Sequence, residues 1–448
     1  MALPTPDVNF FEPDTIACPY PSYDILRDEA PVWQDPMTGM WFVTRYDDIR
    51  AISLDNERFS NALPSGRDGS IRPVDPDGSP ERALVASRAK LLRELYAEQS
   101  IARAPNLSLR DAPDHMALRR LFDFAFRPAA IRDLDELVEE LAYRMIDDVV
   151  AAGECDWVAT FAVPLPLFVI GCQMGIDDAE LPRIKHFTDA WIRRMGLMQD
   201  EDDMRRSVRI EAETRAYFQE HFDRLRREPD DTLLNVLVNR EIPEWGRPLT
   251  DNELHTEVMA DLFVGGSETT TNALSAGVML LIEQPDIWRR LKADPESSLE
   301  PFVEEVLRLE SPVQGLLRET RVDVELQGVT IPAGSVIHLR YGAANRDERQ
   351  FECPRDVKLD RRRPRGHLAF GVGAHHCLGA PLARRELYFG FKALVDRVDE
   401  LRYVETGAAF EYRASYFLRI MDRLDIGVTP AALKARTTTT RSSDTIET

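Results

Sequence analysis

The sequence predicts a mainly α protein with a small β portion. Three observations support this: apolar residues recur at helical spacing through long segments, strand-like alternation is confined to short ones, and no linker or repeat divides the chain. A chain of 448 residues with 44% hydrophobic residues can bury a large core. We therefore expect a single domain over 21–430, preceded by an N-terminal extension at 1–20 and followed by a disordered tail at 431–448, which is rich in Thr and Ser.

Individual elements follow from the spacing of apolar residues. Helical periodicity predicts helices at Ala129–Ala151, Leu181–Leu197, Arg205–Arg226, Asp251–Leu281, Ser297–Leu309 and Ala380–Val395. Alternation predicts short strands at Met40–Thr44, Val322–Leu326 and Ser335–Leu339, with turns at 327–328 and 332–334. Between 61 and 111, residues typical of loops surround one helical piece, Ala83–Gln99, and such a long surface excursion often covers a site.

Composition narrows the class of protein. A net charge of -21 disfavours nucleic acid and anionic membranes as partners, because both would be repelled. The start of the chain lacks an apolar run flanked by basic residues, so we expect no signal peptide or membrane anchor and a cytoplasmic location. The cysteines are odd in number and scattered, which indicates neither a disulfide framework nor a zinc knuckle: Cys18, Cys155, Cys172, Cys353 and Cys377.

Cys377 lies in a glycine-rich turn directly before a predicted helix. Glycines at 371, 373 and 379 permit a tight turn whose amides point at the sulfur, and the helix dipole favours a thiolate there. Thiolate-ligated haem iron favours O–O bond cleavage, so this ligand implies oxygenase chemistry. Two alternatives stay open: a buried free cysteine, and a zinc site formed by His367, His375, His376 and Cys377, although three of these four are adjacent and only some could converge.

The predicted helix at 251–281 has an unusual middle. A capping box, Thr250 to Glu253, opens it, yet Gly265 and Gly266 each cost on the order of 1 kcal/mol in a helix interior. The Thr269 hydroxyl can bond back to the carbonyl four residues earlier, and the glycines would leave a groove that fits dioxygen. The alternative is helix packing through small residues, with Glu268 as a solvated charge.

Both motifs resemble those of one family. Phe370, Gly373, Cys377 and Gly379 match Phe-x-x-Gly-x-x-x-Cys-x-Gly, and residues 265–269 match Ala/Gly-Gly-x-Asp/Glu-Thr. These are similar to the signatures of the soluble bacterial cytochrome P-450 family, with a resemblance that runs from about Pro19 to Pro430. It implies the family's triangular helical prism and haem b (iron protoporphyrin IX), with its iron on Cys377. It further implies that Glu268 relays protons from solvent and that Thr269 steers them during dioxygen cleavage.

The resemblance also supplies partners for the haem propionates. His115 and Arg119 resemble the His-x-x-x-Arg pair, Arg318 resembles the second arginine, and His375 resembles the proximal donor. Singly, each could equally be an ordinary surface group, but their joint spacing relative to Cys377 favours the binding role. The resemblance places four further residues against the haem: Phe370, Gly371, Gly379 and Gly265.

A further pair, Glu305 and Arg308, resembles the family's Glu-x-x-Arg motif. The third partner of that buried network should come from the run at 360–363, where we favour Arg361. We interpret the trio as structural, because breaking a buried ion network tends to destabilise a fold.

Electrons must come from another protein, because neither a Gly-x-Gly-x-x-Gly after a strand nor a cysteine array for an iron–sulfur cluster is present. We predict a ferredoxin, served by a reductase, that docks on a basic patch; the alternative is solvated arginines. This patch comprises Arg119, Arg120, Arg361 to Arg365, Arg384 and Arg385.

The segments 262–266, 312–317 and 417–420 are mostly apolar and predict a hydrophobic small-molecule substrate of terpenoid, steroid, aromatic or fatty acid type, which O2 would hydroxylate or otherwise oxidise. One alternative is a peroxide-using peroxygenase, in which the pair Glu268 and Thr269 would have little purpose. Another is a haem-thiolate gas sensor or carrier, which would need a signalling module.

Overall fold

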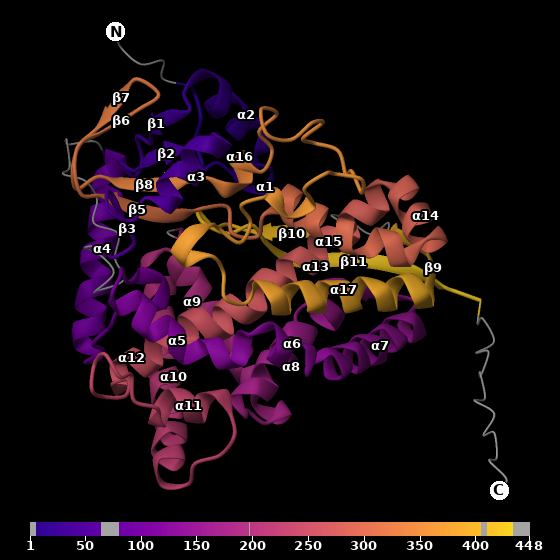
Figure 1. The fold of residues 1–448 in the computed structure, drawn as a ribbon, viewed down its shortest axis with the longest axis horizontal. Helices are drawn as coiled ribbons and strands as arrows, with labels where there is room; N and C mark the ends of the chain where they lie inside the picture. The colour runs from indigo at the N-terminus through magenta and orange to yellow at the C-terminus, as the bar shows by residue number, and fades with distance from the viewer. Residues whose placement is uncertain (1–5, 64–79, 197, 405–409, 433–448) are drawn as a thin grey trace, which may run out of the picture.

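Helices dominate the computed structural model, which describes residues 6–63, 80–196, 198–404 and 410–432 (Figure 1). The large sheet and the β6–β7 hairpin lie at one side of the molecule, whereas β9, β10 and β11 lie among the helices toward the opposite side. The helices are α1 (Pro13–Ala17), α2 (Tyr20–Glu29), α3 (Tyr46–Leu54), α4 (Pro80–Glu98), α5 (Asp114–Phe126), α6 (Pro128–Arg132), α7 (Asp135–Ala152), α8 (Pro164–Met174), α9 (Leu181–Met195), α10 (Glu201–Arg227), α11 (Leu233–Asn239), α12 (Asp251–Thr256), α13 (Thr269–Glu283), α14 (Pro285–Ala293), α15 (Pro295–Glu310), α16 (Tyr341–Ala344) and α17 (Ala380–Arg397). The predicted mainly α fold is confirmed.

The largest sheet has the strand order β1-β2-β8-β5-β3, with β2 and β8 parallel and the other pairs antiparallel. A second sheet joins β10, β11 and β4, with β9 also paired to β11, while β6 and β7 form a hairpin. The strands are β1 (Val32–Gln34), β2 (Trp41–Val43), β3 (Phe59–Ser60), β4 (Glu154–Asp156), β5 (Leu316–Thr320), β6 (Val324–Leu326), β7 (Val329–Ile331), β8 (Val336–Leu339), β9 (Val398–Tyr403), β10 (Phe410–Arg413) and β11 (Ile420–Pro430). The three predicted strands correspond to β2, β6 and β8.

The helix that crosses the molecule runs from α12 to α13, and its middle, Glu257–Glu268, is a π-helix. The predicted capping box is present, since Thr250 N donates to Glu253 Oε2 at 2.8 Å and Glu253 N to Thr250 Oγ1. π-helical turns, with their i→i+5 hydrogen bonds, are rare and are often found at functional sites, which agrees with the predicted special role of this segment.

Helices α13 and α17 pack closely and run parallel (Figure 1). Glu386 on α17 lies beside Thr270 on α13. One turn later, a Cβ built on Gly390 would lie 2.9 Å from Leu274. Thr270 lies beside Glu386 and Leu274 beside Gly390, so the two helices keep a constant offset. With this offset, Gly265 lies level with the first turn of α17, directly after Cys377.

Two predicted boundaries need correction. The helix predicted at Ala129–Ala151 is two helices, α6 and α7, which Asp133 and Leu134 separate. The helix predicted to end at residue 197 ends at Met195, and residue 197 lies outside the described residues.

The predicted excursion at 61–111 is anchored where it is described: Leu92 and Tyr96 of α4 pack against Met204 and Val208 of α10. Before residue 21, Val8 and Phe10 are buried in the core beside the large sheet. Most of the tail predicted at 431–448 lies outside the described residues. In the described part of the chain, no helix is long and apolar enough to span a bilayer.

Candidate active site

The loop before α17 holds Cys377 in a defined turn. Cys377 N donates to the carbonyl of Phe370 at 2.8 Å. Gly371 and Gly373 have φ values of 66° and 82°, a region that disfavours side chains. A Cβ on Gly373 would also lie 3.0 Å from the carbonyl oxygen of Ser53 at the end of α3. Glycine is therefore required at these positions for local reasons.

Two opposing influences act on the pKa of Cys377. Burial raises the pKa of its thiol, whereas the N–H groups of Gly379 and Ala380, followed by the charges of Arg119 and Arg384, lower it. Many protein atoms surround the sulfur, yet the side chain is exposed. We take both observations to mean that it faces an opening inside the molecule rather than the outer surface.

Gly265 in the π-helix and Thr269 at the start of α13 are joined by a hydrogen bond. Thr269 Oγ1 donates to the carbonyl of Gly265 at 2.9 Å, which confirms the predicted back-bond. Gly265 is exposed although Val264 before it is buried, and a Cβ built on it would meet only the Ala260 carbonyl at 3.5 Å. Gly265 thus faces open space, at about the level of the first turn of α17.

Glu268 is buried and paired, so its interpretation as a solvated charge is wrong. Thr188 Oγ1 on α9 donates to its carboxylate at 2.9 Å, and Lys185 Nζ lies 3.1 Å from it. Lys185 also contacts Asp189 at 2.7 Å. Glu268, Lys185 and Asp189 line a pocket of about 330 Å³, together with Asn272, Arg413 and Asp422 among others.

A second carboxyl beside this helix, Glu386, was not predicted. It is buried on α17 beside Thr270, and burial raises its pKa to about 8. At neutral pH it is therefore protonated and can donate a proton. The sequence carries a signal for it, because Leu382 and Phe389 share its apolar helix face and a carboxyl interrupts that face.

Three of the four predicted propionate partners lie close together in the structure, and Arg119 has another role. The rings of His115 and His375 lie 3.9 Å apart, and burial lowers their pKa values to about 4 and about 3, so both are neutral N–H donors. Arg318 is buried near them, its charge acts on His375, and its Nε has no acceptor. Arg119 instead donates to the carbonyls of Ala374 and His376 at 3.3 and 2.9 Å, so it braces the cysteine loop.

This set of groups fits haem b. Arg318 Nε is an orphaned buried donor, and a carboxylate is the acceptor it would need. Two neutral imidazoles beside it add further donors. A haem placed between Cys377 and Gly265 would thus have a sulfur ligand on one face and a glycine on the other. His115, His375 and Arg318 would supply donors for its propionates at the edge.

The zinc alternative fails on geometry. His367 Nε2 is bound to Glu304 at 2.9 Å on α15, while His375 stacks on His115. The four suggested ligands therefore point to different partners. Across the described ranges, no group of three or more His, Cys, Asp and Glu side chains is placed to hold a metal ion.

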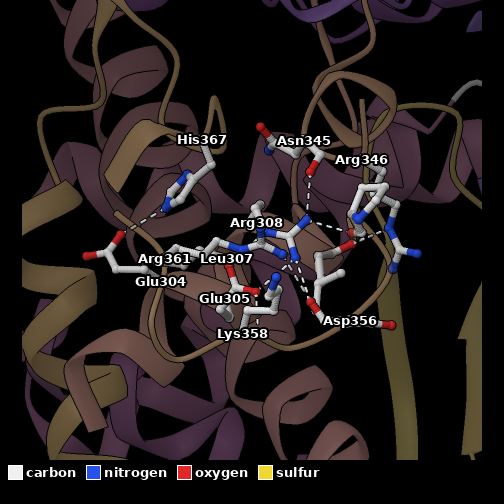
Figure 2. A network of polar contacts seen from close by, with 12 residues as sticks. Glu304, Glu305, Leu307, Arg308, Asn345, Arg346, Asp356, Lys358, Arg361 and His367 are labelled. Atoms are coloured by element: carbon white, nitrogen blue, oxygen red, sulfur yellow. Dashed lines mark hydrogen bonds and ion pairs between the residues drawn. The ribbon is translucent and has the colours of Figure 1, made fainter. Parts of the chain in front are cut away.

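The predicted trio forms a buried network (Figure 2). Arg308 donates to both oxygens of Glu305 at 2.7 and 2.9 Å, and Arg361 Nε donates to Glu305 at 2.8 Å. The remaining donors of Arg308 reach the carbonyls of residues 345, 354 and 356. Next to this trio, Glu304 accepts from Arg384 at 2.7 and 3.1 Å.

These pairings correct the predicted docking patch. Arg361 and Arg384 have their charges matched inside the molecule, and Arg385 donates twice to Asp135 at 2.7 and 2.8 Å. Arg120 is exposed but pairs with Glu244, whereas Arg362 and Arg363 are exposed. The positive surface near the cysteine loop is therefore smaller than the sequence suggested.

Comparison with known proteins agrees with this geometry. A family model described as Cytochrome P450 matches residues 188–399. "Putative cytochrome P450 123" of Mycobacterium bovis is 33% identical over 85% of this chain and 87% of its own length. "Steroid C26-monooxygenase" of Mycobacterium tuberculosis is 30% identical over 92% and 94%. The solved structure of "cytochrome P450 CREJ in complex with (4-ethylphenyl) dihydrogen phosphate" matches with a TM-score of 0.82 at 25% identity, over 94% of this chain and 99% of that one. This chain belongs to the cytochrome P450 family and is a monooxygenase that binds haem b.

Proposed function

We propose that this enzyme inserts one oxygen atom of O2 into a hydrophobic small molecule, with Cys377 as the ligand of the haem iron. The observation that carries the proposal is the placement of Cys377 at the start of α17, level with Gly265 and Thr269 across an internal opening. When bound there, haem b supplies the redox centre for oxygen chemistry, and a thiolate ligand favours O–O cleavage.

Each protein group has a distinct task in this proposal. The N–H groups of Gly379 and Ala380 favour the thiolate form of Cys377. His115, His375 and Arg318 bind the propionates, while Arg119 holds the loop. Phe370, Gly371 and Gly379 would lie against the haem on the cysteine side, and Gly265 on the other.

We call the helix that runs from α12 through the π-helix to α13 the oxygen helix. Protons for the reaction would come from the pocket beside Glu268 on this helix. Glu268 lines that pocket, and Lys185 and Thr188 hold its carboxylate in place. Thr269, the next residue, is turned by its bond to Gly265, so it can pass a proton toward the opening. This arrangement favours an O2-dependent enzyme over a peroxygenase or a gas carrier, neither of which needs such a path.

The ligand is tested by the carbon monoxide difference spectrum of the reduced protein. We expect the red-shifted Soret band typical of a thiolate ligand, and we expect Cys377→Ser to lose it. Cys172→Ser, which changes an exposed free cysteine, is the matched control and should keep the band. A red-shifted band that persists in Cys377→Ser would refute the assignment.

Thr269→Ala tests the proton path. The variant should consume electrons at a similar rate but release peroxide instead of product, while Thr269→Ser, which keeps the hydroxyl, should stay coupled. Thr271 is a poor candidate for this role, because its hydroxyl is buried and donates to the carbonyl of Ala162 at 2.9 Å. Full coupling in Thr269→Ala would reassign the hydroxyl.

We further propose a ferredoxin that docks over the cysteine loop. Leu54 and Met116 are large exposed apolar side chains on the two helices that flank this loop, 47% and 54% exposed. Arg362 and Arg363 supply exposed positive charge. Reversing Arg362 and Arg363 to Glu should slow reduction by a ferredoxin most strongly at low salt, whereas Arg289→Glu, which lies on α14, should not. Equal rates in all variants would remove this proposal; the cytoplasmic location stays a prediction.

A further inference from the structure

A buried charged cluster lies outside the site described above, where α4, α9 and α10 meet. Glu211 on α10 is its centre, and three guanidinium groups approach the Glu211 carboxylate: Arg103 at 3.8 Å, Arg194 at 3.6 Å and Arg215 at 3.6 Å. Tyr96 Oη on α4 donates to the same carboxylate at 3.0 Å. The arginine side chains are only 9%, 5% and 13% exposed, so the cluster is shielded from water.

Charge in this cluster does not balance. Among the residues that the structure describes, Glu211 is the one carboxylate paired with these three arginines. Two of the guanidiniums pack on the Trp191 ring, at 4.7 and 4.5 Å from its centroid, and this compensates only part of a desolvated charge. Buried charges without partners are costly, so the excess of positive charge calls for an anion.

Hydrogen-bond donors in the cluster are also unused. Nε of Arg103, Nε of Arg194, and Nε and Nη2 of Arg215 are buried and have no acceptor within hydrogen-bonding geometry, and Glu211 Oε1, which faces two of them, accepts no hydrogen bond either. Arg215 Nη1 donates to Asn252 Oδ1 at 3.3 Å. The distances from the three guanidiniums to Glu211 exceed those of ordinary hydrogen bonds. A second group with several acceptor oxygens, such as a carboxylate or a phosphate, would satisfy these donors.

The cluster is within reach of the oxygen helix along two elements. Arg194 lies six residues after Thr188 on α9, which is about 9 Å along a helix, and Thr188 contacts Glu268. On the other side, Asn106 follows Arg103 closely and its Nδ2 donates to Asp261 Oδ1 at 2.8 Å, four residues before Gly265. The cluster therefore adjoins the elements that contact this helix at Asp261 and Glu268, on either side of Gly265.

We propose that Arg103, Arg194 and Arg215 bind the anionic group, a carboxylate or a phosphate monoester, of an otherwise hydrophobic substrate. The hydrocarbon part of that molecule then extends from the cluster toward Thr269. This inference names the substrate class of the proposed monooxygenase and rests on that proposed function. A purely structural cluster would be expected to have matched charges and satisfied donors, and this one has neither.

Calorimetric titration of the wild-type holoenzyme tests the proposal without relying on any variant. Three probes share one hydrocarbon chain: dodecanoate, dodecyl phosphate and dodecanol. We expect at least one of the two anions to bind about tenfold or more tightly than the alcohol, since charge-assisted hydrogen bonds are the strong ones. The better anion identifies the group, carboxylate or phosphate. Equal affinity for all three probes would overturn the proposal.

Substitutions then assign the effect to the cluster. Arg194→Gln and Arg103→Gln should each weaken binding of the preferred anion about 10- to 100-fold and leave dodecanol binding unchanged. Arg193→Gln and Arg209→Gln change exposed arginines on the same two helices, α9 and α10, and should bind like the wild type. Unchanged anion preference in Arg194→Gln and Arg103→Gln would place the anion elsewhere and refute the assignment.

The two proposals can fail separately. Calorimetry reports binding without any oxygen turnover, so it still answers if the carbon monoxide spectrum contradicts a thiolate ligand. Conversely, a red-shifted Soret band together with equal binding of the three probes would leave the monooxygenase proposal intact and remove only the anion site.

Discussion

Two buried clusters of arginines and glutamates in this molecule differ in how completely their groups are paired. On α15, Glu304 and Glu305 face Arg308, Arg361 and Arg384, and the donors of Arg308 are all taken by Glu305 and by backbone carbonyls. Around Glu211, three guanidiniums share one carboxylate at longer distances, and several donors have no acceptor. The side chains of the two clusters are buried to a similar extent.

We interpret the fully paired α15 network as structural and the incompletely paired Glu211 cluster as a binding site. The α15 network joins this helix to the segment at 345–361 with short bonds, so its charges are compensated by the fold itself (Figure 2). The Glu211 cluster lies between helices that cover the oxygen helix, and the fold leaves its charge excess in place. Incomplete pairing, rather than burial, therefore marks the region that awaits a ligand.

The largest expected effect comes from breaking the α15 network. Arg308→Gln leaves the buried Glu305 with Arg361 and the Lys358 N–H as partners, and it also frees three backbone carbonyls. We expect the free energy of unfolding to fall by about 3–5 kcal/mol, measured by urea denaturation followed by circular dichroism. Arg289→Gln, which breaks an exposed pair with Asp286, should change it by less than about 0.5 kcal/mol. A loss of similar size in both variants would contradict the structural role.

The sequence predicted the α15 network because its partners are close in the chain. Glu305 and Arg308 are three residues apart on one helix, and Arg361 was inferred from a family motif. The cysteine loop and the bond from Thr269 to Gly265 are likewise local, so residue spacing was sufficient to predict them. Fold class and most helix positions follow from the same kind of periodic signal.

The Glu211 cluster could not be predicted, because its members come from three separated segments. Arg103, Arg194 and Arg215 look like ordinary charged residues until the packing of α4, α9 and α10 buries them together. The partner of Glu268, Lys185, is also on another helix. The π-helix at 257–268 was missed for a related reason, since its hydrogen-bond pattern depends on what packs around it.

Glu386 and Glu304 are both buried carboxyl groups, but, within the ranges that the structure describes, only Glu304 is paired with arginine and histidine side chains. Arginine and histidine neighbours hold the pKa of Glu304 down to about 2, against the burial that raises it, whereas burial raises that of Glu386 from 4.5 to about 8. A raised pKa means that folding keeps the proton, so stability is full below pH 4.5 and declines as pH rises toward 8. Relative to Glu386→Gln, the wild type should lose about 3 kcal/mol between pH 4.5 and 7. Parallel pH profiles of urea midpoints for the two proteins would contradict the raised pKa.

The smallest expected effect is the one that separates the two clusters most directly. Arg194→Gln removes one buried positive charge from the Glu211 cluster, but Arg103 and Arg215 still pair with the carboxylate. Because the charge removed had no full partner, we expect the unfolding free energy of the ligand-free protein to change by less than about 1 kcal/mol, in contrast to Arg308→Gln. Urea denaturation of both variants under one set of conditions checks this, with Arg193→Gln as the exposed control on α9. A loss of 3 kcal/mol or more in Arg194→Gln would show that the Glu211 cluster is as structural as the α15 network, because only a fully engaged guanidinium costs that much to remove.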